Sequence, residues 1–262
     1  MELNVLGQAT YAYTGGKTFD PAKPTLVFAH GAANDHGVWG LQSRYFANHG
    51  YNVLAPDLPG HGRSQGAALD SVEALADWLP ALLDAAGARE AGLIGHSMGS
   101  LVTLEAAARY PERIKTLALL GTAAPMAVSD ALLEAAQKDP DQAYRMINQW
   151  SHGRPLGGNP APGLWQPGCG LALLRHAHPG LIHRDLLNCR QYTHGLEAAA
   201  AVQCPTLLII ALNDLMTAPK AARALLPVLR GTPRVAEIPA CGHAMQGEQP
   251  DGVLDALRAF LL

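Results

Sequence analysis

The chain has 262 residues, of which 48% are hydrophobic and 16% are charged, and its formal net charge at neutral pH is −3. A chain of this size can bury a full core, as one large α/β domain or as two smaller domains. The slightly negative charge excludes the basic footprint of a nucleic-acid-binding protein and gives no attraction to an anionic membrane. The first residues do not read as a signal peptide and no apolar run could span a bilayer, so we expect a cytoplasmic protein.

Short apolar runs of strand length recur along the chain. The first residues are expected to form an antiparallel hairpin at a sheet edge, from residues 3–6 and 9–13. Six further runs lie at residues 25–30, 52–58, 91–97, 116–122, 206–212 and 234–240. Each run is almost continuously apolar, which is typical of a parallel strand that is covered on both faces of its sheet.

Helical patterns alternate with these runs. Apolar residues recur at helical spacing in residues 36–50, 71–87, 99–114 and 218–231. A repeated order of strand, helix and strand predicts a parallel sheet with crossover helices. The predicted fold class is therefore α/β, with a mostly parallel, doubly wound sheet.

One interval, from residue 123 to residue 205, contains no clear buried strand. It carries helical patterns at residues 129–150, 171–177 and 183–202, and a loop rich in glycine and proline at residues 153–170. Because a long insertion in a compact domain is usually functional, we interpret it as a mostly helical cap over one edge of the sheet. The predicted domains are a core of residues 1–124 and 204–262 and a cap of residues 125–203, inserted after the sixth core strand.

Residues 95–99 read Gly-His-Ser-Met-Gly and place a serine in a turn between a predicted strand and a predicted helix. In such a turn, side chains two residues before and after the serine would collide with the neighbouring strand and helix, and Gly95 and Gly99 avoid this. The hydroxyl of Ser97 is then expected at the carboxyl end of the sheet. A serine is a poor nucleophile at neutral pH, so it needs a base, an acid that orients the base and donors for an oxyanion.

Two backbone groups are the candidate donors. Residues 28–39 run from a strand through His30 and Gly31 into a loop, and the glycine allows a sharp turn at the same end of the sheet. The N–H of Ala32 is therefore expected to point toward Ser97. The N–H of Met98 is the second donor, and the two would form an oxyanion hole.

The base and its orienting acid are expected after the last two strands. His243 lies in a glycine-containing loop directly after the final apolar run, and Asp214 lies just past the run before it. The order Ser97, Asp214, His243 along the chain is the one this strand arrangement requires. All three residues follow carboxyl ends of strands, where ligands bind in open α/β sheets.

Four stretches together resemble the α/β-hydrolase superfamily over nearly the whole chain. They are HGAANDHGVW at residues 30–39, PDLPGHGRS at residues 56–64, GHSMGS at residues 95–100, and ALNDLMTAP with CGHAMQGEQP at residues 211–219 and 241–250. The resemblance implies a capped, carboxylesterase-like serine hydrolase that cleaves a small-molecule ester through an acyl-enzyme, without a cofactor. It does not identify the substrate, and the oligomeric state is left open.

Other residues have structural interpretations beside functional ones. We expect Asp57 and Arg63 to pin a loop through hydrogen bonds, and Glu248 to mark the start of the final helix, with Pro250 in its first turn. An apolar pocket or packing between cap and core explains four cap residues equally well: Met126, Met146, Trp150 and Trp165. We expect no metal, because no pair of cap histidines has the i, i+4 spacing with a glutamate. The four cysteines form no CxxC pair, and we expect them to be reduced and mostly buried.

Several rival functions share this sequence pattern. Dehalogenases and epoxide hydrolases of the superfamily use an aspartate nucleophile, so Ser97 argues against both. Proline-releasing peptidases carry a loop richer in glycine and proline than residues 30–37. The main alternative is a carbon–carbon bond hydrolase of ring-cleavage products with the same triad, and perhydrolysis is a conceivable side activity. A non-catalytic small-ligand receptor on the same scaffold is the alternative of another class.

Overall fold

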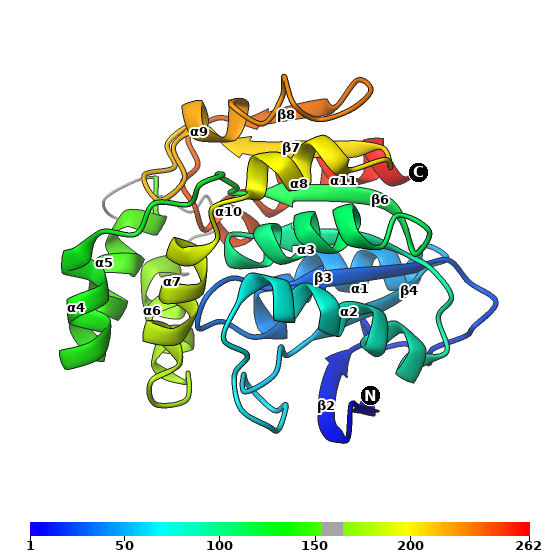
Figure 1. Cartoon of the computed structure of the whole chain (residues 1–262), viewed down its shortest axis with the longest axis horizontal. Helices are drawn as coiled ribbons and strands as arrows, with labels where there is room; N and C mark the ends of the chain where they lie inside the picture. Colours follow the sequence, from blue (N-terminus) through cyan, green and yellow to red (C-terminus); the bar gives the residue numbers. More distant parts are fainter. Residues whose placement is uncertain (154–164) are drawn as a thin grey trace.

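The computed structural model describes residues 1–153 and 165–262, and its centre is an eight-stranded sheet (Figure 1). The strands are β1 (Glu2–Val5), β2 (Gln8–Tyr13), β3 (Thr25–Ala29), β4 (Asn52–Pro56), β5 (Ala91–His96), β6 (Ile114–Leu120), β7 (Thr206–Ala211) and β8 (Arg234–Ile238). Their order in the sheet is β1-β2-β4-β3-β5-β6-β7-β8. The pairs from β4 to β8 are parallel, whereas β1 and β2 pair antiparallel at one edge, so the predicted strands and edge hairpin are confirmed.

Helices cover both faces of this sheet. They are the 3₁₀ helix η1 (His36–Trp39), α1 (Gly40–Asn48), α2 (Val72–Ala86), α3 (Met98–Arg109), α4 (Asp130–Lys138), α5 (Pro140–Ser151), α6 (Gln166–Arg175), α7 (Leu181–Gln191), α8 (Gly195–Ala201), α9 (Pro219–Arg223), α10 (Met245–Glu248) and α11 (Pro250–Leu261). Helices α2, α3 and α8 lie on the near face in Figure 1, and α1 and α11 lie behind the sheet. The predicted mostly parallel α/β architecture is confirmed.

Each face of the sheet has its own apolar core. Every residue of β3, β4, β5 and β7 is buried, as the continuous apolar runs require. On the far face, the fully buried ring of Trp39 lies 5.4 Å from that of Phe28, and Phe46 packs against Phe28 at 6.2 Å. Burial of one such side chain stabilises the fold by about 1.5–3 kcal/mol, so these rings anchor η1 and α1 beneath β3.

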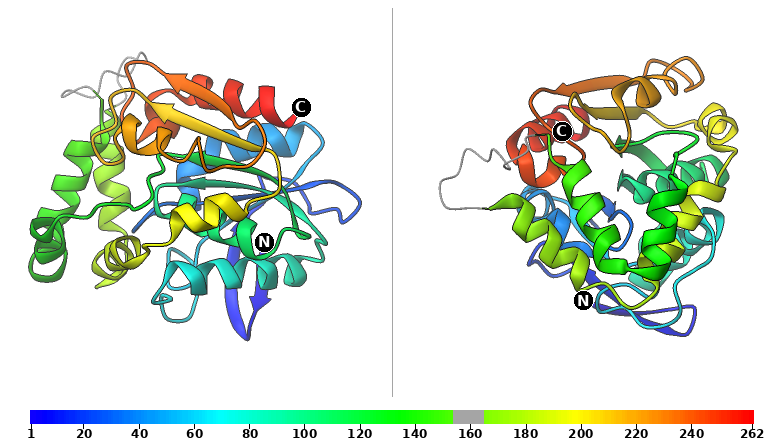
Figure 2. Two further views of the ribbon diagram at one scale, coloured as in Figure 1. Left: turned by 45° about the horizontal axis from the view of Figure 1, so that its top comes forward. Right: turned by 90° about the vertical axis from the view of Figure 1, so that its left-hand side faces the viewer.

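Helices α4 to α7 stand at the end of the sheet toward which the parallel strands point (Figures 1 and 2). They pack mainly against one another and enclose a separate apolar cluster that includes Leu132, Tyr144 and Ile182. Helix α8, which also follows β6 in the chain, packs instead against α3 beside the sheet. The four helices therefore lie over the carboxyl edge, where the sequence pattern predicts a functional site.

The helices depart from the predicted segments at three places. The pattern of residues 129–150 divides into α4 and α5 at Asp139, because Pro140 disfavours helical geometry in the residue before it. Helix α9 ends at Arg223 and continues as turns, because Pro227 lacks the N–H that would bond to that residue. Helix α6 begins at Gln166, inside the predicted loop of residues 153–170. Residues 154–164 of that loop lie outside the described part of the chain.

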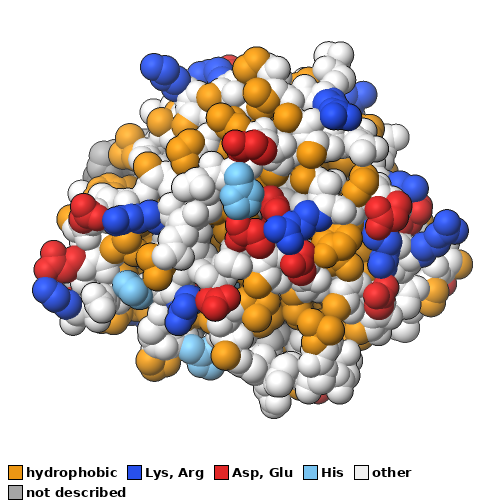
Figure 3. Space-filling view, in the orientation of Figure 1, with side chains coloured by type: hydrophobic (Ala, Val, Ile, Leu, Met, Phe, Trp, Pro, Cys, Tyr) orange, Lys and Arg blue, Asp and Glu red, His pale blue; other side chains and the backbone are white. Residues whose placement is uncertain are grey.

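The surface agrees with the charge balance of the chain. Figure 3 shows acidic and basic side chains interspersed on one face of the molecule, without a large area of one sign. Within the described residues, no helix combines the length and apolarity that crossing a membrane would need. All four cysteines are free thiols; Cys189 and Cys241 are buried, whereas Cys169 is exposed.

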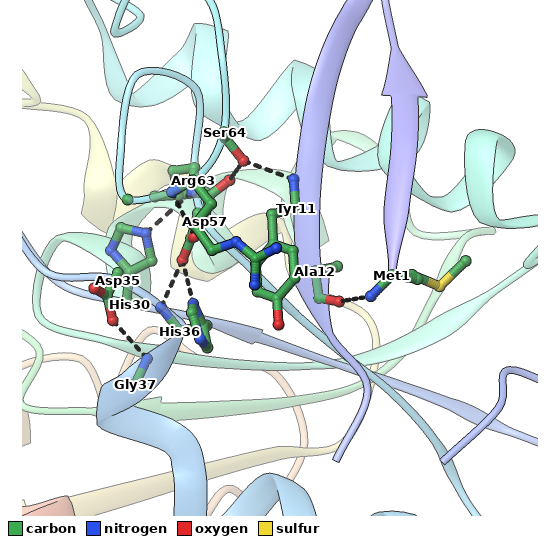
Figure 4. Close-up of polar contacts among 12 residues, drawn as sticks. Met1, Tyr11, Ala12, His30, Asp35, His36, Gly37, Asp57, Arg63 and Ser64 are labelled. Atoms are coloured by element: carbon green, nitrogen blue, oxygen red, sulfur yellow. Dashed lines mark hydrogen bonds and ion pairs between the residues drawn. The ribbon is translucent and has the colours of Figure 1, made fainter. Parts of the chain in front are cut away.

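Asp57, which follows β4 in the chain, holds two loops at the carboxyl edge (Figure 4). Its Oδ1 accepts hydrogen bonds from the backbone N–H of His36 at 2.8 Å and from His36 Nδ1 at 2.7 Å. Its Oδ2 accepts from the backbone N–H of Arg63 at 2.9 Å, and the Arg63 guanidinium lies over the ring of Tyr11. The loop-pinning role predicted for Asp57 is confirmed, whereas Arg63 contributes its backbone N–H and not a hydrogen bond from its side chain.

Both partners of the Asp57–His36 pair have shifted pKa values. The hydrogen bond to Asp57 raises the pKa of His36 above 6.5. Burial acts to raise the pKa of Asp57, but hydrogen bonds from His36 and Arg63 outweigh burial and hold this pKa below 3.8. The stabilisation that protonated His36 contributes is therefore complete below pH 6.5 and is lost as the pH rises through its raised pKa. The stabilisation that ionised Asp57 contributes is lost in acid instead.

We predict that His36→Gln lowers the free energy of unfolding more at about pH 5.5 than at about pH 8.5, because the imidazolium that pairs with Asp57 exists only at the lower pH. Urea unfolding of both proteins at the two pH values measures this difference. His176→Gln, at an exposed histidine directly after α6, is the matched control and should leave the free energy of unfolding unchanged at both pH values. If His36→Gln lowers the free energy of unfolding by the same amount at both pH values, the result would contradict an ion pair between His36 and Asp57.

Candidate active site

Ser97 occupies a strained turn between β5 and α3. Its backbone angles are φ 55° and ψ −123°, in a region that a side chain other than glycine enters at a cost of about 1–3 kcal/mol. The sheet holds this conformation, because the N–H of Ser97 donates to the carbonyl of Leu120 on β6 at 3.0 Å. The turn leaves Ser97 partly exposed at the carboxyl edge.

The flanking glycines make this turn possible. A Cβ on Gly95 would lie 2.2 Å from the carbonyl oxygen of Gly99, and a Cβ on Gly99 would lie 2.4 Å from that of Ala29 on β3. Both distances are far inside van der Waals contact with rigid backbone. A third glycine, Gly31, brings the loop after β3 against the serine, since its Cβ would meet that of Ser97 at 3.1 Å.

His243 and Asp214 meet at the same edge although 29 positions separate them. His243 Nδ1 lies 2.7 Å from Asp214 Oδ2, and both side chains are buried. The other carboxylate oxygen accepts from the N–H groups of Met216 and Thr217, each at 2.8 Å, and the Thr217 hydroxyl donates to Oδ2 at 2.7 Å. The carboxylate is thus fixed from three sides and faces the imidazole.

The electrostatics of this pair favour a charged aspartate. Burial acts to raise the pKa of Asp214, but the nearby His243 and the hydrogen bonds from His243 and Thr217 outweigh it, so the pKa lies below 3.8. An ionised Asp214 holds the Nδ1–H tautomer of His243 and leaves Nε2 free to accept a proton. This is the arrangement that a general base requires.

His243 is held in place by two further residues, which the sequence pattern did not predict. The buried His96 donates from Nε2 to the His243 carbonyl at 2.8 Å, and burial lowers the pKa of His96 to about 3, which keeps it neutral. Gly121, at the end of β6 with φ +54°, leaves room for the imidazole, because its Cβ would lie 2.9 Å from His243 Cε1. Nothing in the sequence around His96 indicated its contact with the loop of His243. A glycine directly after a buried strand, by contrast, is a pattern that could have identified Gly121.

Glu248 does not begin the final helix, contrary to the prediction. It ends the short helix α10, and Pro250 starts α11 two residues later, in the first-turn position expected for it. The buried carboxylate accepts from the N–H of Gly242 at 2.6 Å and from the N–H of Gly153 at 3.0 Å. Glu248 therefore fixes the loop of His243 and joins it to the end of helix α5.

A cavity of about 1230 Å³ opens beside Ser97 and His243. Ala32 also lines it, and Met98 lies buried at the start of α3, directly after the serine. Of the four predicted pocket residues, Met126 and Trp150 line this cavity. The other two do not contribute to its described lining: Met146 packs among helices α4 to α7, and Trp165 is 68% exposed.

One group of side chains has the spacing of metal ligands. The candidate ligand atoms of Asp35, His36 and Asp57 lie within 4.8 Å of one another. However, the Asp57 oxygens already accept from N–H groups of His36 and Arg63, and Asp35 Oδ1 accepts from the N–H of Gly37 at 2.7 Å. A metal would have to displace these hydrogen bonds, so the group fits a loop anchor better than a metal site.

The chain is similar to known hydrolases in sequence and in fold. Residues 24–152 match the family model described as the alpha/beta hydrolase fold. The chain is 35% identical, over 96 residues, to (E)-2-((N-methylformamido)methylene)succinate hydrolase of Acinetobacter baylyi, and this match covers 36% of each chain. It is 28% identical to the putative carbamate hydrolase RutD of Klebsiella pneumoniae over 261 residues, which cover 92% of this chain and 94% of the relative.

The fold extends the similarity to the whole chain. The esterase EaEST from Exiguobacterium antarcticum matches with a TM-score of 0.86 and 17% identity, covering 99% of this chain and 98% of that one. The two proteins therefore share their fold, although at this identity the match shows nothing further. Together with the family model and the near-full-length relative, it establishes that the chain belongs to the α/β-hydrolase superfamily.

Proposed function

We propose that this protein is a serine hydrolase that cleaves a small-molecule ester through an acyl-enzyme on Ser97. The family supports a hydrolase. The observation that carries the finer proposal is the 2.7 Å contact between His243 Nδ1 and Asp214 Oδ2 beside a serine held at positive φ. A nucleophile, a base and an orienting acid in this order support a Ser-His-Asp triad.

The mechanism follows from the proposed roles. His243 Nε2 takes the hydroxyl proton of Ser97 as the oxygen attacks the ester carbonyl, and Asp214 stabilises the imidazolium that forms. The N–H groups of Ala32 and Met98 donate to the oxyanion. His243 then gives its proton to the leaving alcohol. A water molecule, deprotonated by the same histidine, attacks the acyl-enzyme and releases the acid and the free serine.

The cap is part of this proposal. Residues 125–203 would form it, and helices α4, α5 and α6 contribute described residues to the wall of the cavity. Met126 and Trp150 give this wall an apolar surface near Ser97, which suits an uncharged acyl or alkoxy group. The carbon–carbon hydrolase and the non-catalytic receptor remain alternatives, and they differ from the esterase in what a simple ester assay would show.

We predict that Ser97→Ala lowers kcat for p-nitrophenyl acetate by about a million-fold, because the base and oxyanion donors act only through the nucleophile. A fluorophosphonate probe should label the wild type at Ser97 and leave the variant unlabelled. Ser71→Ala, which removes the N-cap of α2 far from the site, should lower stability by about 1 kcal/mol and leave kcat unchanged. Full activity in Ser97→Ala, or labelling of another serine, would refute the proposal.

The charge of the cavity wall bears on the substrate. Among its described residues, Arg44 is the only one with a permanent charge, and no aspartate or glutamate lines the cavity. No described acidic group pairs with the Arg44 guanidinium, so it can meet a substrate carboxylate without competition. One relative acts, by its name, on a succinate derivative, which carries such groups. We infer that the site accepts an ester with a carboxylate remote from the scissile bond.

We predict that Arg44→Gln raises KM for mono-p-nitrophenyl succinate about 2- to 5-fold, since an exposed ion pair contributes up to about 1 kcal/mol. KM for the neutral p-nitrophenyl butyrate should not change. Arg89→Gln, at an exposed arginine outside the cavity lining, is the control for net charge. Equal effects on both esters would show that Arg44 does not select the charge of the substrate.

A further inference from the structure

A buried carboxylate from α7, far along the chain, contacts the loop that carries the proposed oxyanion donor. Asp185 is 1% exposed, and its Oδ2 accepts the backbone N–H of Ala33 at 2.8 Å across 152 positions of the chain. The same oxygen lies 2.9 Å from His61 Nε2, in the loop after β4. Asp185 therefore joins a helix of the proposed cap to two loops of the core, one of which contains Ala32.

The conformation of Ala33 needs such a restraint. Its φ is +54°, in the left-handed region, which costs an L-residue roughly 1–2 kcal/mol. Its side chain is 2% exposed and belongs to the apolar cluster of the cap helices. That cluster contains Leu132, Ala135, Ala136, Ala143, Tyr144, Leu174, Ile182 and Leu186. The cap thus holds Ala33 through both its amide and its methyl group.

The geometry also gives His61 a charge. Its Nε2 faces the Asp185 carboxylate and its Nδ1 lies 3.0 Å from the carbonyl oxygen of Pro59, so both ring nitrogens face acceptors and both must donate. Burial lowers the pKa of His61, but Asp185 outweighs burial and the net pKa lies above 6.5. The neighbouring His30 is neutral, because burial lowers its pKa to about 3. The Asp185 carboxylate therefore faces a positively charged donor inside the protein.

We propose that Asp185 is a positioning residue: from the cap, it fixes Ala33 in the left-handed conformation and thereby aims the N–H of Ala32 at the oxyanion. The cap then does more than cover the pocket, because it completes the catalytic geometry of the core. This role rests on the proposed function, since it assigns Ala32 to the oxyanion hole. Asp57 holds the other end of the same loop through the N–H of His36, so the loop is restrained at both ends.

The test compares Asp185→Leu, which keeps the shape of the side chain but removes the acceptor for the Ala33 N–H, with Asp130→Asn, which changes an exposed ion pair with Arg190 on the same group of helices. In Asp185→Leu we expect kcat for p-nitrophenyl acetate to fall about 10- to 100-fold, less than the loss from removing a donor outright. KM should change less than about 3-fold, because so small an ester depends little on the cap wall. The inhibition constant of a boronic acid, whose adduct places an oxygen in the oxyanion hole, should rise in parallel with the loss of kcat. Asp130→Asn should match the wild type in all three.

Other outcomes overturn the proposal. An unchanged kcat in folded Asp185→Leu would show that Ala33 keeps its place without the acceptor that Asp185 supplies. A rise in KM with kcat preserved would show that Asp185 shapes the pocket wall only. His61→Gln keeps the acceptor for the Ala33 N–H, so a kcat loss as large as that of Asp185→Leu would assign the effect to the lost charge pair rather than to the loop.

Amide exchange provides a readout that needs neither turnover nor a folded variant. In the wild type, the Ala33 amide should exchange as slowly as the helical amides of α7, and fast exchange at Ala33 would overturn the proposal even if Asp185→Leu fails to fold. In a folded Asp185→Leu, this protection should be lost while the amides of β5 stay protected. If Ala33 is protected but no ester is hydrolysed, the proposed function fails and the link between cap and loop stands.

Discussion

The strained turn at Ser97 is the constraint on which the site depends. A serine at positive φ persists only because β5 lies between β3 and β6 and because two glycines let α3 approach the strand within backbone contact. The same closeness fixes the neighbours: Gly31 follows β3 on one side, and Gly121 follows β6 on the other. The space that Gly121 leaves is the space that the imidazole of His243 occupies. One compressed strand-to-helix turn thus determines where the loops of three adjacent strands can lie.

Buried carboxylates hold those loops, which have no ladder hydrogen bonds of their own. Four acids share this arrangement and accept from backbone N–H groups at the carboxyl edge: Asp57, Asp185, Asp214 and Glu248. Three of them also face a histidine: His36, His61 and His243. A buried charge is tolerated only where it is paired or hydrogen-bonded. Each of these carboxylates therefore favours the one position of its loop in which the backbone N–H groups can donate to it. The same interaction therefore supports the fold and orders the candidate catalytic groups.

The strands and the candidate triad were predictable because each depends on local pattern. Continuous apolar runs marked β3 to β7, glycine spacing marked the turn at Ser97, and position after a strand marked Asp214 and His243. The errors arose where the local signal was ambiguous. Glu248 lies two residues before a helix-starting proline and resembles a helix start, whereas its carboxylate turns back to Gly242 and Gly153. The pattern of residues 129–150 carries apolar residues at helical spacing on both sides of residue 140, and Pro140 indicated the break at Asp139.

By itself, the sequence determined the order of strands and helices, the turn around Ser97 and the candidate residues for its chemistry. These follow from hydrophobic period, glycine placement and residue type, which act over a few positions of the chain. The tertiary structure alone decided that Asp185 meets Ala33 across 152 positions, that His96 bonds to the loop of His243, and which residues of the helices after β6 reach the cavity. Such contacts depend on how the helices after β6 pack against the core. No local pattern records that packing, because many helix orientations would bury the same apolar faces equally well.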